Sequence, residues 1–222
     1  MKMIFFLLAV ILFITACDKN AEPNPSLTDI DGNGYDTIKI GTQFWMQKNL
    51  KTSHYRNGDP IPEITSMSLW SSQTSGAWCW YNNDSVKYAA VYGKLYNWYA
   101  VNDPRGLAPK GWHVPSDIEW STLSVRLGGD LVAGLELKES GTSHWIESNI
   151  GATNASGFTG LPGGYCDKAG NFENIFRYGI WWSSAEQSSD NAWYRYLNYS
   201  LEMFNMDTES KQYGFSVRCL KD

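Results

Sequence analysis

Alternating polar and apolar residues near the start of the chain predict a β-strand. Thr37-Ile38-Lys39-Ile40 has this pattern, and a second short segment, Gln43-Phe44-Trp45-Met46, follows after Gly41. A period of two is typical of strands with one buried face, and we expect both segments to be strands. The preceding Gly32-Asn33-Gly34 favours a tight hairpin turn.

The strongest helix signal is Ser116-Asp117-Ile118-Glu119, which has the form of a capping box. In this motif the serine hydroxyl and the glutamate carboxylate accept hydrogen bonds from amides left free at the helix start. The apolar face of the helix would consist of Trp120, Leu123 and Leu127, and Gly128-Gly129 would end it. This gives Glu119 a structural role, so we do not expect it to be a catalytic acid.

The segment from Val91 to Val101 is less clear. Its aromatic and apolar residues recur at helical spacing, which fits one buried helical stripe formed by Tyr92, Leu95, Tyr96 and Tyr99. A buried strand is the alternative, because aromatic residues also favour sheets.

From Gly151 onward, short apolar segments are separated by Gly and Asn, which indicates a β-rich half. Residues 193–197 alternate two kinds of side chain, as a half-buried strand does. The strands we expect here are 157–159, 178–184, 192–199 and 214–219.

The N-terminal residues have the pattern of an export signal. Met1-Lys2 is followed by the apolar run Met3–Ile14, which is shorter than the roughly 20 residues that a membrane-spanning helix needs. Ile14-Thr15-Ala16-Cys17 resembles the lipobox of bacterial lipoproteins. We therefore expect residues 1–16 to be a signal peptide and Cys17 to carry the lipid that anchors the protein to a membrane of the cell envelope, most simply the outer membrane or cell surface.

Residues 17–28 contain Pro23, Pro25 and several polar residues, so we interpret them as a flexible tether. The remainder, 29–222, has the length of one large domain. Its composition limits the choice of partners. The whole chain has 18 basic and 23 acidic residues, a net charge of −5 and no basic run, which argues against nucleic acid.

Three cysteines follow the expected lipidation site: Cys79, Cys166 and Cys219. In an oxidising compartment at most one pair can form among them. We expect Cys79 to pair with Cys219, which would join the aromatic segment to the C-terminal strand and leave Cys166 free. A Cys166–Cys219 bond is the alternative.

Five motifs follow one another between residues 93 and 219: Gly93–Val101, Pro109–Ser116 with Glu119-Trp120, Leu161–Tyr165, Trp181–Ser184 and Gly214–Cys219. In sequence and in order they resemble the hallmarks of the Fibrobacter succinogenes major paralogous domain family. The resemblance covers residues 29–222, and many members of the family are lipoproteins.

The resemblance implies a fold more securely than an activity. The family is distantly similar to C-type-lectin-like domains and to the formylglycine-generating sulfatase-modifying family. This implies an α+β fold with two helices packed on small twisted antiparallel sheets and long irregular loops on one face. Members often have a cysteine just before the Pro-Lys-Gly-Trp-His motif, where this chain has Ala108.

Enzymatic chemistry has little support in the sequence, so we predict a non-enzymatic protein without cofactor or metal. His54, His113 and His144 lack metal-ligand spacing. The acidic segment Asp29–Tyr35 fails as a calcium loop, because the last position of such a loop would be Ile40. There is no Gly-x-Ser-x-Gly nucleophile motif either.

The remaining hypothesis is binding through aromatic side chains, which make up 15% of the chain as Phe, Trp and Tyr. Ring faces can stack on the apolar faces of sugars, and neighbouring polar groups can bind the sugar hydroxyls. A polysaccharide is the expected ligand, and an envelope protein is the alternative partner. The candidate binding residues are Trp78, Trp80, Tyr81, Asn83 and Asp84, and, as a second cluster, Trp193 and Arg195.

Overall fold

The computed structural model describes residues 27–222, and its first strand begins at Leu27. β1 (Leu27–Thr28) pairs with β2 (Gly34–Tyr35) across a turn, as the sequence predicts for this hairpin. The Asp29 carboxylate accepts hydrogen bonds from the backbone N–H groups of Asp31 (3.0 Å) and Asn33 (2.9 Å). Leu27 is buried, so the last two residues of the expected tether belong to the folded domain.

The two predicted strands are present as β3 (Thr37–Ile40) and β4 (Gln43–Met46), and the structure shows that they pair in antiparallel register. They form part of a four-stranded sheet of order β3-β4-β13-β7, in which β7 is Trp112–His113 and β13 is Leu220–Lys221. The expected strand at 214–219 makes only isolated bridges, so regular pairing starts later, at Leu220.

The capping-box helix is α4 (Asp117–Arg126), and both hydrogen bonds of the box are present. Trp120 and Leu123 on its inner face are fully buried. The local sequence alone therefore placed this helix correctly.

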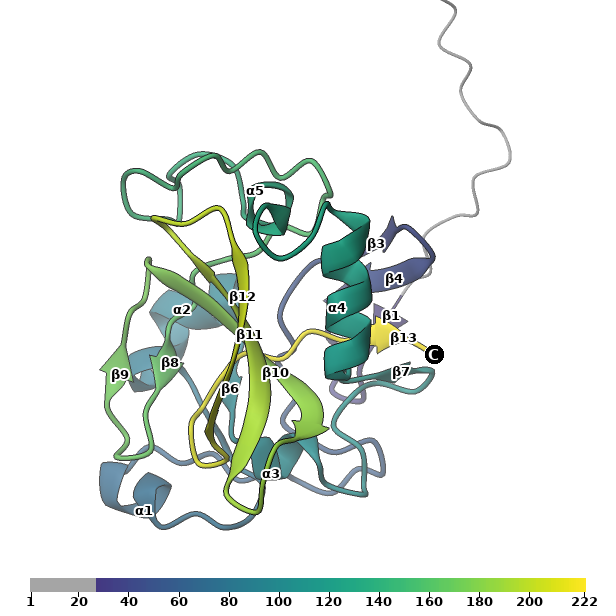
Figure 1. Ribbon diagram of the computed structural model, residues 1–222. Coiled ribbons are helices and arrows are strands. Elements are labelled where there is room, and N and C mark those ends of the chain that lie inside the picture. Colours follow the sequence, from purple (N-terminus) through teal and green to yellow (C-terminus); the bar gives the residue numbers. More distant parts are fainter. Residues whose placement is uncertain (1–26) are drawn as a thin grey trace, which may run out of the picture.

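The sheet with the longest strands, which we call the large sheet, is antiparallel with order β10-β11-β12, and it crosses the middle of the molecule beside α4 (Figure 1). β10 (Tyr178–Glu186) and β11 (Asn191–Asn198) confirm two predicted strands. β12 (Phe204–Ser210) lies in a segment that we did not predict as a strand, and the expected strand 157–159 is a loop.

The prediction of one helical stripe at 91–101 is wrong. α2 (Ser85–Tyr92) ends there, β6 (Leu95–Tyr96) follows, and a short α3 (Trp98–Val101) comes next. Gly93 separates them, with φ +70°, where a Cβ atom would lie 2.8 Å from the carbonyl oxygen of Leu50. The break occurs because the chain must pass close to the 49–50 backbone, which periodicity cannot reveal.

The described residues contain five α-helices, not the expected two. The prediction was wrong in this number because three of the helices span only four or five residues and lack strong local signals. The elements not yet named are α1 (Met67–Ser71), β5 (Trp78–Cys79), the 3-10 turn η1 (Tyr81–Asn83), α5 (Ala133–Leu137), β8 (Tyr165–Cys166) and β9 (Phe172–Glu173).

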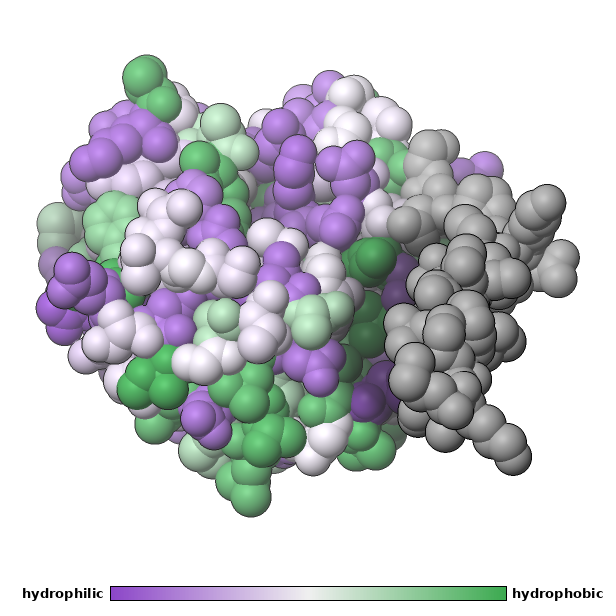
Figure 2. Space-filling view, turned by 90° about the horizontal axis from the view of Figure 1, so that it is seen from above, coloured by the Kyte–Doolittle hydropathy of each residue, from purple (hydrophilic) through white to green (hydrophobic). Residues whose placement is uncertain are grey.

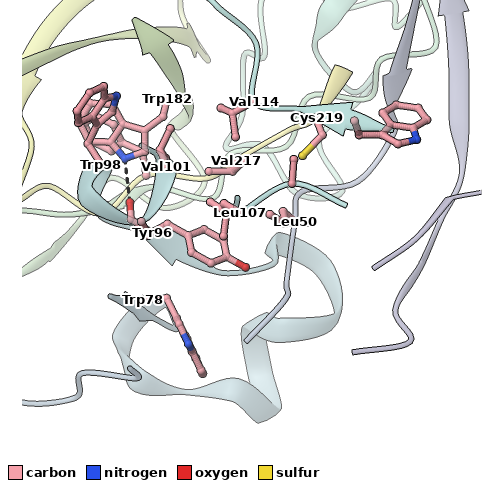
Figure 3. Packing of buried hydrophobic residues seen from close by; sticks show 14 of the residues in the cluster. Leu50, Trp78, Tyr96, Trp98, Val101, Leu107, Val114, Trp182, Val217 and Cys219 are labelled. Carbon is pink, nitrogen blue, oxygen red and sulfur yellow. Dashed lines mark hydrogen bonds between the residues drawn. The ribbon is translucent and has the colours of Figure 1, made fainter. Parts of the chain in front are cut away.

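Buried side chains form three groups. The central cluster contains Tyr96, Trp182, Val217 and Cys219, and Figure 3 shows the Trp182 indole N–H donating to the carbonyl oxygen of Tyr96. The helix cluster lies between α4 and the large sheet and contains Trp45, Trp120, Phe158, Trp181 and Leu197. The α2 cluster contains Trp70, Cys79, Tyr81, Tyr88, Tyr92, Leu95 and Cys166.

Candidate functional site

Most of the first predicted binding cluster has a structural role. Trp78 is only 5% exposed, and its indole N–H donates to the carbonyl oxygen of Ile61 (2.8 Å). The Lys94 ammonium lies over the Trp78 ring, 3.4 Å from its centroid. Tyr81 is buried between Tyr88 and Phe172. Neither ring has a free face for a ligand.

The polar members of that cluster hold the backbone. The Asn83 amide donates to the carbonyl oxygen of Thr65 (2.9 Å), and the Asp84 carboxylate accepts from the backbone N–H of Lys87 (3.0 Å) as the N-cap of α2. The half-buried Trp80 lines an open hollow of about 450 Å³.

The second predicted cluster lies on one side of β11 and does not form an open site. Arg195 is 1% exposed and donates to Asp117 (3.0 Å), Asp130 (3.2 Å) and Ser121 (2.7 Å). These contacts fasten β11 to α4 and to the loop after it, so the guanidinium is not available to a ligand. Trp193 is half-buried, and by strand alternation it shares the side of β11 that Arg195 occupies.

A different hollow, which we call the tyrosine groove, lies on the other side of this strand. Its volume is about 280 Å³. Its rings form a continuous series, with centroid separations of 5.9 Å for Tyr178–Tyr196, 5.8 Å for Tyr196–Tyr194 and 4.9 Å for Tyr194–Phe215. The groove is lined by Tyr165, Asn174, Tyr178, Ile180, Tyr194, Tyr196, Glu209, Tyr213 and Phe215.

The groove combines partly exposed rings with available polar atoms. All five tyrosines are half-buried. Asn174 donates to the Tyr165 hydroxyl (3.2 Å), whereas the hydroxyls of the other four tyrosines have no hydrogen-bond partner among residues 27–222. They can therefore exchange water for the hydroxyl groups of a ligand.

Three phenols of the groove have raised pKa values and stay uncharged near neutral pH. Burial raises the pKa of Tyr194, and the carboxylates of Asp207 and Glu209 raise it further. Burial also raises the pKa of Tyr196 and of Tyr213. The groove thus presents neutral hydroxyl groups beside the Glu209 carboxylate.

The Leu161–Tyr165 motif places one wall of the groove. Gly164 has φ +61°, and its backbone N–H donates to the carbonyl oxygen of Tyr178 (2.9 Å). A Cβ atom at Gly164 would come within 2.5 Å of the Glu173 carbonyl oxygen, so only glycine allows this close approach. The next residue, Tyr165, then faces Tyr213 at 5.9 Å.

Other family-like motifs build the core. The Trp181 indole N–H and the Arg218 guanidinium both donate to the side-chain oxygen of Asn49, at 2.8 and 3.0 Å. Arg218 is fully buried, which lowers its pKa to about 9, and it lies over the Phe158 ring at 4.2 Å. These residues specify the fold and do not reach the groove.

The cysteine prediction needs correction. Cys79, Cys166 and Cys219 are buried free thiols, so the expected Cys79–Cys219 disulfide is not formed. Cys79 belongs to the α2 cluster together with Cys166, whereas Cys219 belongs to the central cluster. The sequence could not show which strands the fold brings together.

The histidines are engaged with carboxylates. His113 contacts Asp222 (2.7 Å) and Glu119 (2.9 Å), and His144 contacts Glu139 (2.8 Å). Across the part of the chain that the structure describes, no group of three or more His, Cys, Asp or Glu side chains could hold a metal ion.

The expected signal peptide, Cys17 and most of the tether lie outside the described residues. Within residues 27–222, none of the helices combines the length and the apolar character needed to cross a bilayer.

Comparison with known proteins identifies the family. No curated protein and no solved structure matches the chain. The model of one family, described as the Fibrobacter succinogenes major domain, matches residues 38–221. This range contains all five motifs and the whole tyrosine groove. The chain therefore belongs to the Fibrobacter succinogenes major domain family.

Proposed function

We propose that this protein is a lipid-anchored, non-enzymatic domain that binds glycan in the tyrosine groove. The observation that carries the proposal is the series of five half-buried tyrosines around one hollow, four of them with available hydroxyl groups. The groove replaces the sites that we expected at Trp78 and Arg195.

The chemistry of the groove suits a sugar. A pyranose has faces of C–H groups and a rim of hydroxyl groups, so it matches aromatic faces that alternate with polar atoms. Tyrosine provides a rigid ring and a hydroxyl at low cost in side-chain entropy. The volume of about 280 Å³ lies just below the usual range for small-molecule sites, about 300–1,000 Å³, so we propose that one sugar ring enters the groove.

The proposed location rests on the N-terminal sequence. Signal peptide 1–16, lipidated Cys17 and a tether up to residue 26 would hold the domain outside the cytoplasm, at the outer membrane or cell surface. We also propose that the fold is C-type-lectin-like, which agrees with its five helices and small antiparallel sheets.

A glycan array followed by calorimetry on its hits tests the binding. Tyr194→Ala should weaken binding about fivefold to thirtyfold, because it removes a stacking ring that contributes roughly 1–2 kcal/mol. The matched control is Trp193→Ala, which removes the neighbouring ring from the opposite side of β11. Equal loss in both variants, or no binding to any glycan, would contradict the proposal.

The anchor has its own test. Cells that make the full chain are fed an alkyne-tagged fatty acid, and the label on the protein is measured. Wild-type protein should be labelled and a Cys17→Ser variant should not. An unlabelled wild-type chain would remove the anchor from the proposal but would leave the groove untouched.

A structural role in an envelope protein assembly is the second candidate, and one observation favours it. Ile118 and Val125 are seven residues apart and therefore lie on the same side of α4. This side faces away from the core, since Ile118 is 78% exposed and Val125 is 75% exposed. Figure 2, viewed from the α5 end, shows separate apolar spots among polar residues. An Ile118→Ser/Val125→Ser variant that loses a purified envelope partner while keeping glycan binding would assign this second role to α4.

A further inference from the structure

Two cysteines that are far apart in the sequence lie together in the α2 cluster. Cys79 is on β5 and Cys166 is on β8, and each is 1% exposed. Both side chains belong to the same buried apolar cluster. After burial, the neighbouring Cys166 thiol contributes most to raising the pKa of the Cys79 thiol.

The fold fixes both cysteines through one segment of backbone. Cys79 is paired with Leu95, and Tyr96 forms a bridge with Phe215. The preceding residue, Gly214, exchanges both backbone hydrogen bonds with Cys166, at 2.8 and 3.0 Å. The strands that carry the two thiols are therefore held against the same 214–215 segment, so their proximity does not depend on a mobile loop.

Cys219 occupies a different environment. It is fully buried in the central cluster, where its backbone N–H contacts the Met46 sulfur at 3.4 Å. Figure 3 shows Cys219 close to Val114 and Leu50 and apart from Trp78, the residue that precedes Cys79. A bond between Cys219 and Cys79 would have to connect two separate core clusters.

We propose that Cys79 and Cys166 form the disulfide of this protein under oxidising conditions and that Cys219 stays a free thiol. The co-reactant is a disulfide oxidant, either a small-molecule disulfide or the disulfide of an oxidase. The thiolate of one cysteine attacks it and releases one thiol, and the second cysteine then attacks the mixed disulfide and releases the other. The two protein thiols lose two protons and two electrons, and the oxidant becomes two thiols.

Burial determines when this exchange takes place. The thiolate is the reactive form of cysteine, and burial holds the pKa of Cys79 well above its usual value, as it does that of Cys219. Exchange is therefore slow in the folded protein and takes place during folding, before the α2 cluster closes. Once folded, the oxidised protein resists reduction, and the reduced protein resists oxidation.

Trypsin makes the test simple, because it places each cysteine on a separate peptide: Met3–Lys19, Asn57–Lys87, Glu139–Lys168 and Cys219–Lys221. The full chain is refolded in a mixture of oxidised and reduced glutathione, its remaining thiols are alkylated in denaturant, and the digest is analysed without reduction. We expect Asn57–Lys87 linked to Glu139–Lys168, with a mass lower by two hydrogen atoms than the sum of the two peptides, and an alkylated Cys219.

Single variants separate this pairing from its rivals. Cys219→Ser should keep the linked peptide, and Cys79→Ala or Cys166→Ala should abolish it. The linked protein should also melt several degrees above the reduced protein, with no such difference in Cys166→Ala. A link to Cys219–Lys221, or alkylation of all three core cysteines after oxidative refolding, would overturn the proposal. Refolding requires neither export nor ligand, so this result is independent of the proposed glycan binding.

Discussion

The two faces of the β10-β11-β12 sheet are made by the same strands but have opposite character. The face toward α4 carries Trp181, Arg195 and Leu197, which are all fully buried. The other face carries Tyr194 and Tyr196, which are half-buried and line the tyrosine groove. Along β11, consecutive residues therefore alternate between core and groove.

The faces differ in whether their polar groups are already bonded. Arg195 donates to two carboxylates and a hydroxyl, and the Trp181 indole donates to Asn49. The groove tyrosines have ring contacts but leave their hydroxyl groups available. Substitutions on the α4 side should thus change stability, and substitutions in the groove should change binding.

The largest effect should come from Trp181→Ala. The side chain is fully buried, and its loss leaves a cavity and removes the partner of Asn49, so unfolding free energy should fall by about 3–5 kcal/mol. Urea denaturation measures it. The half-buried Trp193 is the matched control, and Trp193→Ala should cost about 1 kcal/mol. If both variants lose the same unfolding free energy, full burial does not make Trp181 more important for stability than Trp193.

The buried cation Lys138, beyond the end of the same sheet, should make the stability of the fold depend on pH. Lys138 is fully buried, and its ammonium donates to the carbonyl oxygens of Ile150 and Leu201, both at 2.8 Å. Burial lowers its pKa to about 8. The folded state then binds fewer protons than the unfolded state between about pH 8 and pH 10.5, so stability due to Lys138 rises with pH in that window.

The expected rise is at most about 3 kcal/mol, and Lys138→Met should remove it. It is measured as the difference in unfolding free energy between wild type and variant at several pH values from about 7.5 to 10.5. The exposed Lys168 provides the control, because Lys168→Met should leave the pH dependence unchanged. A constant difference between wild type and Lys138→Met across this range would contradict the assignment.

A smaller effect should follow from loosening the helix that covers the sheet. Ser116→Ala removes the hydroxyl of the capping box and should lower unfolding free energy by about 1 kcal/mol. Thermal melting measures this loss. The Ser200 hydroxyl accepts no hydrogen bond from a helix amide, so Ser200→Ala should lower the unfolding free energy by less than Ser116→Ala does. No change in Ser116→Ala would mean that packing alone holds α4.

The sequence predicted those elements whose signals are local. The capping box determined α4, and alternation with turn residues determined β3, β4, β10 and β11. The segment 91–101 failed because the break at Gly93 depends on the Leu50 backbone, far away in the sequence. The predicted disulfide partner of Cys79 was wrong for the same reason. The strands that carry Cys79 and Cys166 are brought together by the 214–215 segment, which is distant from both in the sequence.

The position of the groove shows a more specific limit of prediction from the sequence. The sequence correctly indicated that residues 193–197 alternate between two faces, but the candidates chosen were Trp193 and Arg195, one residue out of phase with the groove. Alternation does not show which face the core will cover. That choice depends on the acidic partners of Arg195 in and after α4 and on Tyr165 and Tyr213, which come from other parts of the chain.

The smallest change in stability, and the sharpest test of the contrast between faces, should come from Tyr196→Phe. The ring and its contacts with Tyr178 and Tyr194 remain, so unfolding free energy should change by less than about 0.5 kcal/mol. The lost hydroxyl should weaken glycan binding about threefold to tenfold, because a neutral hydrogen bond contributes about 0.5–1.5 kcal/mol. Tyr199, half-buried against the helix cluster, is the control, and Tyr199→Phe should leave affinity unchanged. If Tyr196→Phe instead lowers the unfolding free energy by more than about 1 kcal/mol and leaves the affinity unchanged, the hydroxyl stabilises the fold, and the two faces of β11 do not divide stability from binding.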